Sequence, residues 1–361
     1  MTLMQARRQN VSIPAWSGDQ LDSPFPPEIE APYFDDHLRA WVLSRHADIL
    51  TAFHSSKLTP ASLNREKDAE ESDESGRLRM RADTAQALSP ARLRAWRDEL
   101  NAESVSLAGR LPIGIPVDLM LAYARPLCLA LAVKVTGISK SAAETIYDQA
   151  EEVSAAAADP FDARLRARAK AANTNLRNSF HSGPEPLRDS GFVALSQTMP
   201  CLLGNAWFAL LQFPEQWALL HQQPQLMEQG MEELLRYAGP VRILTRRAIE
   251  DFELNGIPIH KGERIVLRIF ASNRDPGRFS CPDELDILRS DSGHFTLGAS
   301  AHACVAAGLI RAAATAITHP LIQRFASMTP ASHVEWKGGS VFRFPKSLWV
   351  RLALTETHAD L

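Results

Sequence analysis

The order of the patterned segments constrains the fold of this chain more than any other feature of its sequence. Apolar residues with helical spacing run through most of the first two thirds, and strand-like alternation comes late. The expected helical segments are about residues 77–110, 116–180, 192–213 and 226–237. Because helices and strands do not alternate regularly, a doubly wound parallel sheet is disfavoured. The pattern predicts a mainly α fold with small β-sheets.

The strand-like runs lie in three places. Residues 33–45 are expected to form a short hairpin. Residues 240–270 are rich in strand patterns, and Asn255-Gly256 predicts a hairpin turn between two of them. The tail at 341–352 alternates like a pair of edge strands with Pro345 in the turn. A further helix is expected directly after the cysteine near residue 304.

Composition is typical of a globular protein and sets several functional classes aside. The 361 residues are 45% hydrophobic and 22% charged, with a net charge of −3, so nothing draws the chain as a whole toward nucleic acid or a membrane. The helical pattern is interrupted at 181–186, but the sequence contains no internal repeat and no linker long enough to separate two domains. A single domain over residues 1–361 is therefore predicted.

Cysteine usage and the N-terminus bear on location. The four cysteines form no CxxC pair, which suits a reducing cytoplasm. The start MTLMQARRQN lacks the apolar core of a signal peptide, and apolar runs such as 127–133 are too short to cross a bilayer. A cytoplasmic location without membrane attachment is expected.

The most suggestive local feature is the stretch 294–311. Small residues surround His302 and Cys304, so a bulky planar group can approach the backbone closely. Cys304 precedes an Ala-rich helix, whose N-terminus favours a thiolate over a thiol. A thiolate there suits the axial position of a haem iron. The alternatives are an inert buried cysteine, or a zinc site with His294 that lacks a fourth ligand.

A second motif precedes this stretch. The helix ending in MEELLRY places Glu233 and Arg236 three residues apart, on one face, away from the apolar residues Met227 and Met231. Alone, the pair predicts no more than a surface ion pair worth about 0.5 kcal/mol. It is followed, in order, by Pro240-Val241, Arg246, a strand-rich run, ASNRDPGRF and the Cys304 loop.

In this order of motifs the chain resembles the cytochrome P-450 family, the haem-thiolate monooxygenases, in its soluble bacterial form. The resemblance covers essentially the whole chain and is densest between Pro214 and Arg311. It implies the cytochrome P-450 fold, a haem b cofactor and Cys304 as the axial ligand of the haem iron. It also implies an ion-pair triad that supports the haem-binding core, made of Glu233, Arg236 and Arg289.

The resemblance further implies which side chains bond the haem propionates. They are His302, Arg246, Arg77 and Arg81. Arg77 replaces the histidine that the family usually has, and it keeps a positive hydrogen-bond donor at that position.

The Cys304 loop departs from the family pattern. Leu297 replaces an aromatic residue near the sulfur, which is expected to alter the surroundings of the thiolate. Ser300 and Ala306 replace two glycines. Wherever the backbone needs a positive φ, a non-glycine residue costs about 1 kcal/mol, which haem binding can tolerate.

The helix at 192–213 matches the family's oxygen-activating helix. Thr198 keeps the hydroxyl that relays protons in the family, and Gln197 replaces the usual acid. Glutamine can hold a water but cannot ionise, so weaker coupling of electrons to product is expected. Pro200 removes one backbone donor and is expected to distort the helix near Thr198.

The resemblance implies an oxidoreductase that uses dioxygen to hydroxylate or dealkylate a small or medium-sized apolar organic substrate. Electrons would come from a ferredoxin or flavodoxin with its reductase, docking on the arginines of 77–97. A shortened lid is expected near residues 160–190. Two alternatives stay open: a degenerate, non-catalytic scaffold protein, and a peroxide-driven variant that bypasses the missing acid.

Overall fold

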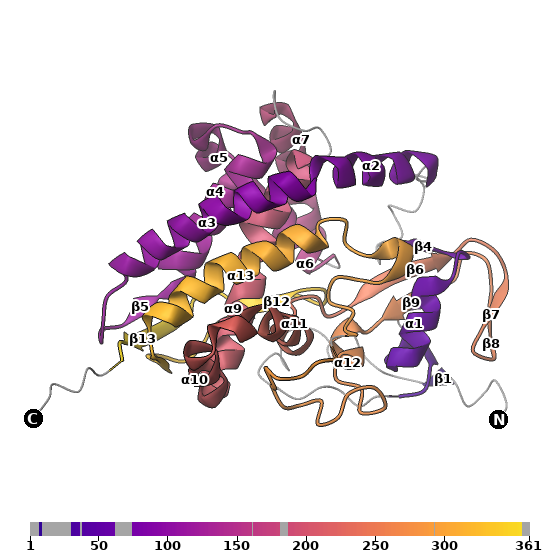
Figure 1. Cartoon of the computed structure of the whole chain (residues 1–361). Helices are drawn as coiled ribbons and strands as arrows, with labels where there is room; N and C mark the ends of the chain where they lie inside the picture. The colour runs from indigo at the N-terminus through magenta and orange to yellow at the C-terminus, as the bar shows by residue number, and fades with distance from the viewer. Residues whose placement is uncertain are drawn as a thin grey trace, which may run out of the picture.

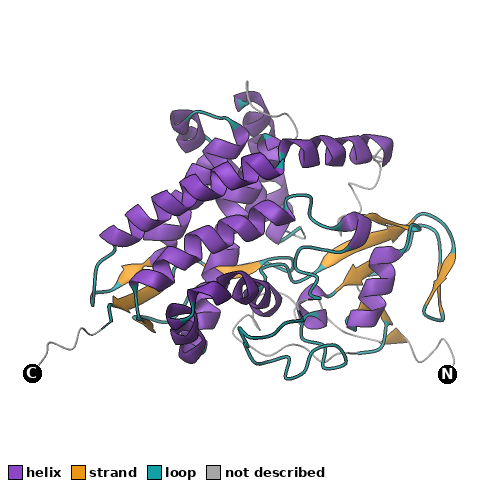
Figure 2. Ribbon diagram, in the orientation of Figure 1, coloured by secondary structure: helices purple, strands orange, loops and turns teal. Residues whose placement is uncertain are grey.

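The computed structural model describes residues 7–8, 30–36, 38–61, 74–160, 162–180, 187–291 and 293–355. Over these residues the chain is mainly helical, with one six-stranded sheet and three smaller sheets. Most helices gather on one side of the molecule, and the six-stranded sheet lies on the other (Figure 1; Figure 2). The predicted mainly α fold with small β-sheets is confirmed.

The helices follow the expected segments closely. In chain order the α-helices of the described residues are α1 His46–His54, α2 Glu74–Ala87, α3 Pro90–Arg110, α4 Arg125–Thr136, α5 Lys140–Thr145, α6 Tyr147–Ala158, α7 Ala163–Ser179, α8 Asp189–Val193, α9 Met199–Gln212, α10 Pro214–Gln222, α11 Met227–Ala238, α12 Ile269–Ser272 and α13 Ala307–Arg324. Two π-helical turns are η4 Met120–Ala124 and η6 Ala194–Thr198, and two 3-10 turns are η7 Pro224–Leu226 and η8 Ser300–His302. The segment expected at 77–110 is divided between α2 and α3, since Pro90 is suited to the first turn of a new helix. The break expected at 181–186 lies outside the described residues.

One continuous helix, formed by α8, η6 and α9, crosses the main hydrophobic core. This confirms the helix expected at 192–213, and nearly every side chain of α9 is buried. Within it, η6 is a π-helical turn in which the N–H of Met199 donates to the carbonyl of Ala194. Pro200 offers no N–H to the carbonyl of Ser196, so the wider turn accommodates the missing α-helical bond. The distortion expected from Pro200 is therefore confirmed.

The strands form short ladders. They are β1 Arg7–Arg8, β2 Tyr33–Asp35, β3 Ala40–Leu43, β4 Leu58–Pro60, β5 Val117–Asp118, β6 Leu244–Ala248, β7 Phe252–Leu254, β8 Ile257–Ile259, β9 Arg264–Leu267, β10 Ser327–Pro330, β11 Trp336–Gly338, β12 Arg343–Pro345 and β13 Trp349–Ala353. The large sheet has the order β1-β2-β3-β9-β6-β4. The hairpin expected at 33–45 is confirmed by the antiparallel pair β2–β3. Asn255 and Gly256 have φ of 49° and 82°, as a tight turn between β7 and β8 requires.

The tail differs from its prediction. The residues at 341–352 do contain two strands, β12 and β13, but these do not pair with each other. Strand β12 pairs with β11, whereas β13 lies between β10 and β5 in another sheet. Alternation in the sequence gives the face of each strand but not its partner, which here lies elsewhere in the chain.

A buried ion-pair triad links α11 to the loops that follow β9. Arg236 is fully buried and donates from Nε and Nη2 to both carboxylate oxygens of Glu233, each at 2.7 Å. Its remaining donors bond the carbonyls of Asn273, Pro282 and Glu284 at 2.8–3.0 Å. Arg289 Nε lies 3.1 Å from Glu233 Oε2. The alternative of a solvated surface pair is therefore wrong, because the chain after β9 wraps over this face of α11.

We expect Glu233→Gln to destabilise the fold by about 3–5 kcal/mol, because it leaves the cations of Arg236 and Arg289 buried without their shared carboxylate. Urea unfolding followed by circular dichroism measures the loss. The matched control is Glu228→Gln, at an exposed site in the first turn of α11, which should cost no more than a few tenths of a kcal/mol. Equal, small effects of the two substitutions would contradict the buttressing role.

Candidate functional site

The loop before α13 holds Cys304 in a tightly bonded turn. The N–H of Cys304 donates to the carbonyl of Leu297 at 2.7 Å, and the N–H of Ala303 donates to the carbonyl of Ser300 at 3.1 Å. Gly298 and Ser300 have positive φ, 72° and 53°, so the strain expected from a non-glycine residue does fall on Ser300. Ala306 has φ of −91° and carries no such strain.

The electrostatic surroundings of Cys304 differ from the expectation. Burial raises the pKa of its thiol, although a hydrogen bond with the backbone of Ala306 and the charges of Arg81 and Arg311 act in the opposite direction. Cys304 lies three residues before α13, and removal from water outweighs the helix N-terminus. The protein by itself therefore favours the thiol, and a bound cation would be needed to stabilise the thiolate.

Hydrogen bonds tie this loop to the buried triad. The side chain of Asn273, whose carbonyl binds Arg236, accepts from the N–H of Phe295 at 2.8 Å and donates to Thr296 Oγ1 at 2.9 Å. Thr296 Oγ1 in turn donates to the carbonyl of Leu235 in α11 at 2.6 Å. A continuous bonded path thus runs from Arg236 through Asn273 to the loop that ends at Cys304.

Glu232 anchors both ends of the loop. Its carboxylate bonds Arg311 of α13 at 2.5 and 3.1 Å, and His294 Nε2 lies 3.4 Å away. Burial alone would raise the pKa of Glu232, but His294 and Arg311 lower it to about 2. The carboxylate therefore stays ionised and holds the loop start and the helix together.

Arg246 is a buried cation whose charge is not balanced. It is 4% exposed, its Nη1 donates to the carbonyl of Thr245, and its Nε has no partner among the residues that the structure describes. Burial lowers its pKa to about 10. The guanidinium lies 5.3 Å from the ring centre of Phe53, which packs on Phe295 of the Cys304 loop. A buried cation of this kind calls for an anionic group of a ligand.

Of the other residues predicted to bond the haem propionates, the structure describes the side chain of Arg81. Arg81 Nη2 donates to the carbonyl of Ala303 at 2.8 Å, so α2 is brought against the Cys304 loop. The side chains of Arg77 and His302 lie outside the described part of the structure. In the described residues no group of three or more His, Cys, Asp or Glu is placed to hold a metal ion; the zinc alternative also needs His302, so it stays untested.

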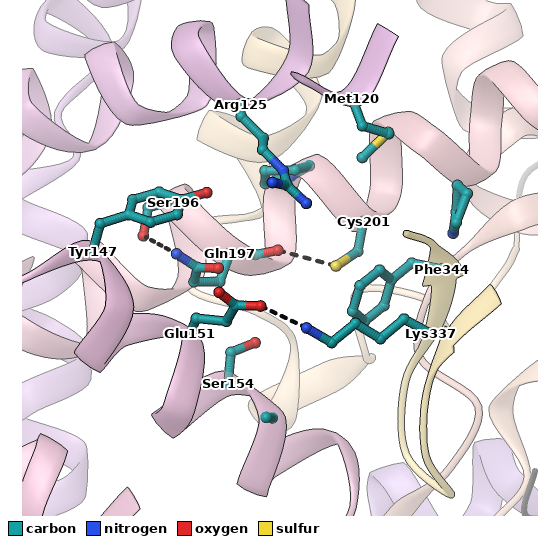
Figure 3. A pocket seen from close by; sticks show the side chains of 13 residues that line it. Met120, Arg125, Tyr147, Glu151, Ser154, Ser196, Gln197, Cys201, Lys337 and Phe344 are labelled. Atoms are coloured by element: carbon teal, nitrogen blue, oxygen red, sulfur yellow. Dashed lines mark hydrogen bonds and ion pairs between the residues drawn. The ribbon is translucent and has the colours of Figure 1, made fainter. Parts of the chain in front are cut away.

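The two residues predicted on the oxygen-activating helix both lie in the π-helical turn η6. Thr198 is its last residue and is half-buried. The side chain of Gln197 faces a pocket between α4, α6, η6 and β12, and its Nε2 donates to Ser196 Oγ at 3.5 Å (Figure 3). Gln197 also acts on Tyr147, where it opposes the burial that raises the pKa of that hydroxyl. None of the lining residues of that pocket belongs to the Cys304 loop.

Several residues of the site were missed from the sequence. Asn273 and Glu232 hold the loop, and Tyr147 lines the same pocket as Gln197, but the sequence pattern indicates none of them. The only available signal was the presence of Asn273 in ASNRDPGRF and of Glu232 beside Glu233. In each case the partner is remote in sequence, so local pattern gave no reason to choose them.

Known proteins are similar to this chain in sequence and fold. The matching family model is Cytochrome P-450, over residues 217–330. The biotin biosynthesis cytochrome P-450 of Bacillus subtilis (strain 168) is 37% identical over 152 residues, which are 42% of this chain and 38% of that protein. Nocardicin C N-oxygenase of Nocardia uniformis subsp. tsuyamanensis is 27% identical over 363 residues, covering 89% of this chain and 90% of that protein.

The fold is shared as well. A crystal structure of P-450 BioI in complex with an acyl carrier protein ligated to hexadec-9Z-enoic acid superposes with a TM-score of 0.81 at 20% identity, covering 93% of this chain and 100% of that one. Among the described residues, no helix is both long enough and apolar enough to span a bilayer. The ordered motifs, the fold and the relatives agree: the chain is similar to the cytochrome P-450 family, by its family model over residues 217–330 and by its fold over most of its length.

Proposed function

We propose that the chain is a haem-thiolate monooxygenase that hydroxylates or dealkylates a small or medium-sized apolar organic substrate. The observation that carries the proposal is the pairing of a firmly anchored, half-buried Cys304 with the buried and unbalanced cation of Arg246. A scaffold protein would have no use for an uncompensated buried charge, which lowers stability unless a ligand neutralises it.

These residues fit a haem b. Cys304 would bind the iron, and the cation there would offset the burial that now raises the pKa of the thiol. Arg246 would bond one propionate, and Arg81, already against the loop, together with Arg77 and His302 would complete the set. When bound, the haem supplies the activation of dioxygen and the transfer of one oxygen atom to the substrate.

The protein's own residues would supply protons to the reaction. Thr198 offers a hydroxyl that can accept and donate a proton at Oγ1. Gln197 cannot ionise, and its side chain lines the pocket beside α6, where its Nε2 donates to Ser196 Oγ at 3.5 Å. Proton supply at η6 therefore depends on water held by neutral groups, which favours uncoupled turnover or a peroxide-driven variant.

Electron supply would come from a separate ferredoxin or flavodoxin with its reductase. Exposed arginines on α2 and α3, namely Arg79, Arg92, Arg94 and Arg97, provide positive charge on the helices next to the Cys304 loop. A cytoplasmic location, a single domain and a shortened lid around α7 complete the proposal.

The proposed function is tested by labelled-oxygen turnover. Apolar organic molecules are screened by their shift of the haem spin state, and the best binder is turned over under isotope-labelled dioxygen with ferredoxin and reductase. One labelled oxygen atom in the product is expected, and Thr198→Ala should reduce its yield. If none of the tested molecules shifts the haem spin state and no labelled product forms, the scaffold alternative is favoured.

Arg246→Met is expected to separate haem binding from stability. Loss of a charge-assisted bond should weaken haem retention roughly 10- to 100-fold, measured by haem transfer to apomyoglobin. The haem-free protein should unfold at an equal or higher urea concentration, because an unbalanced buried charge is gone. Arg247→Met, on the neighbouring residue of β6, is the control. Unchanged haem transfer in Arg246→Met would remove Arg246 from the site.

Gln197→Glu should improve coupling. A carboxyl group at η6 can ionise and pass a proton, so the share of electrons recovered in product should rise several-fold and hydrogen peroxide release should fall. Oxygen consumption, peroxide and product are measured together. Gln212→Glu, at the exposed end of α9, should change none of them. If peroxide release is the same in Gln197→Glu and the parent protein, Gln197 does not limit proton supply.

A further inference from the structure

The pocket beside Gln197 lies away from the Cys304 loop. Its empty space, with the open mouth included, is about 550 Å³. Helices α4 and α6, the turn η6 and the hairpin β11–β12 supply its walls (Figure 3). The mouth is open to solvent, and Gln197 forms part of the inner wall.

The charges that line this cavity do not cancel. Glu151 and Lys337 form an ion pair with a separation of 2.5 Å, which neutralises both. Arg125 adds a further positive charge, and no carboxylate of the described residues pairs with it; its Nη2 is 3.5 Å from the carbonyl of Lys346. The charge of Arg125 reaches across the cavity, since it opposes the burial that raises the pKa of Tyr147 and of Cys201.

The neutral walls supply the other parts of a ligand site. The hydroxyl of Tyr147 and the amide of Gln197 lie on one side. Apolar surface comes from Met120, Pro200 and Phe344. An excess cation, neutral donors and an apolar wall in one small cavity are the features that bind a compact organic acid, because the guanidinium can pair with the carboxylate while the body is removed from water.

We propose that this cavity binds a small organic carboxylate with a compact apolar body, held by Arg125 and contacting Gln197. The site shares no residue with the Cys304 loop, and it meets the proposed proton path at Gln197. The cavity reaches η6 through Ser196 and Gln197, so an occupant can alter the contact between Tyr147 and Gln197 without touching the Cys304 loop.

The test measures binding of 4-fluorobenzoate to the full-length, haem-loaded protein by fluorine NMR, with 4-fluorobenzamide as the uncharged counterpart. We expect a Kd of about 1 mM or tighter for the acid, and weaker binding of the amide. Arg125→Gln should weaken binding of the acid about tenfold or more, because a charge-assisted bond is lost. Arg97→Gln, at an exposed arginine paired with Asp98 on α3, should leave it unchanged.

A second variant gives a change of opposite sign. Glu151→Gln removes a negative charge from the cavity and should tighten binding of the acid roughly two- to fivefold. A variant that merely disturbs the fold would not tighten binding, so the two variants together separate charge recognition from collapse of the pocket. Equal binding of acid and amide, unchanged binding in Arg125→Gln, or weaker binding in Glu151→Gln would each overturn the proposal.

Discussion

The fully buried pair of Glu233 and Arg236 is the interaction on which the rest of the site depends. Arg236 uses all of its donors, two on Glu233 and the others on three backbone carbonyls, so it fixes the path of the chain after β9. One of those carbonyls belongs to Asn273, whose side chain holds the start of the Cys304 loop. The position of the cysteine is thus set by a carboxylate about seventy residues earlier in the chain, through buried bonds that tolerate little displacement.

The site combines this rigid loop with groups that the fold leaves electrostatically unsatisfied. Arg246 is buried without a compensating anion among the described residues, and burial disfavours the thiolate of Cys304. The buried cation costs stability in the protein alone, whereas Cys304 stays a neutral thiol; a ligand that brings a metal cation and anionic side groups would reverse both features. Thr198 and Gln197 both lie in the π-helical turn η6 of the core helix. The side chain of Gln197 lines the pocket between α4 and α6, which contains no residue of the Cys304 loop.

The sequence could predict what depends on local chemistry. The turn at Asn255-Gly256 and the distortion at Pro200 follow from backbone conformations that few residues allow, and both are present. It could not predict what depends on remote segments. The apolar stripe of α11 suggested that Glu233 and Arg236 face solvent, because nothing in that helix reveals the loop that covers them. The partners of β12 and β13, the raised pKa of Cys304 and the cavity beside Gln197 are non-local in the same sense.

The central claim is that Cys304 provides a thiolate ligand to a haem iron. It is tested most directly by the carbon monoxide difference spectrum of the reduced, haem-loaded protein, compared with Cys304→Ala and with Cys281→Ala, which alters an exposed cysteine. We expect a strongly red-shifted Soret band in the parent protein and in Cys281→Ala, and its disappearance in Cys304→Ala. A Soret band that is unchanged in Cys304→Ala, or a protein that takes up no haem when haem is supplied in excess, would contradict it.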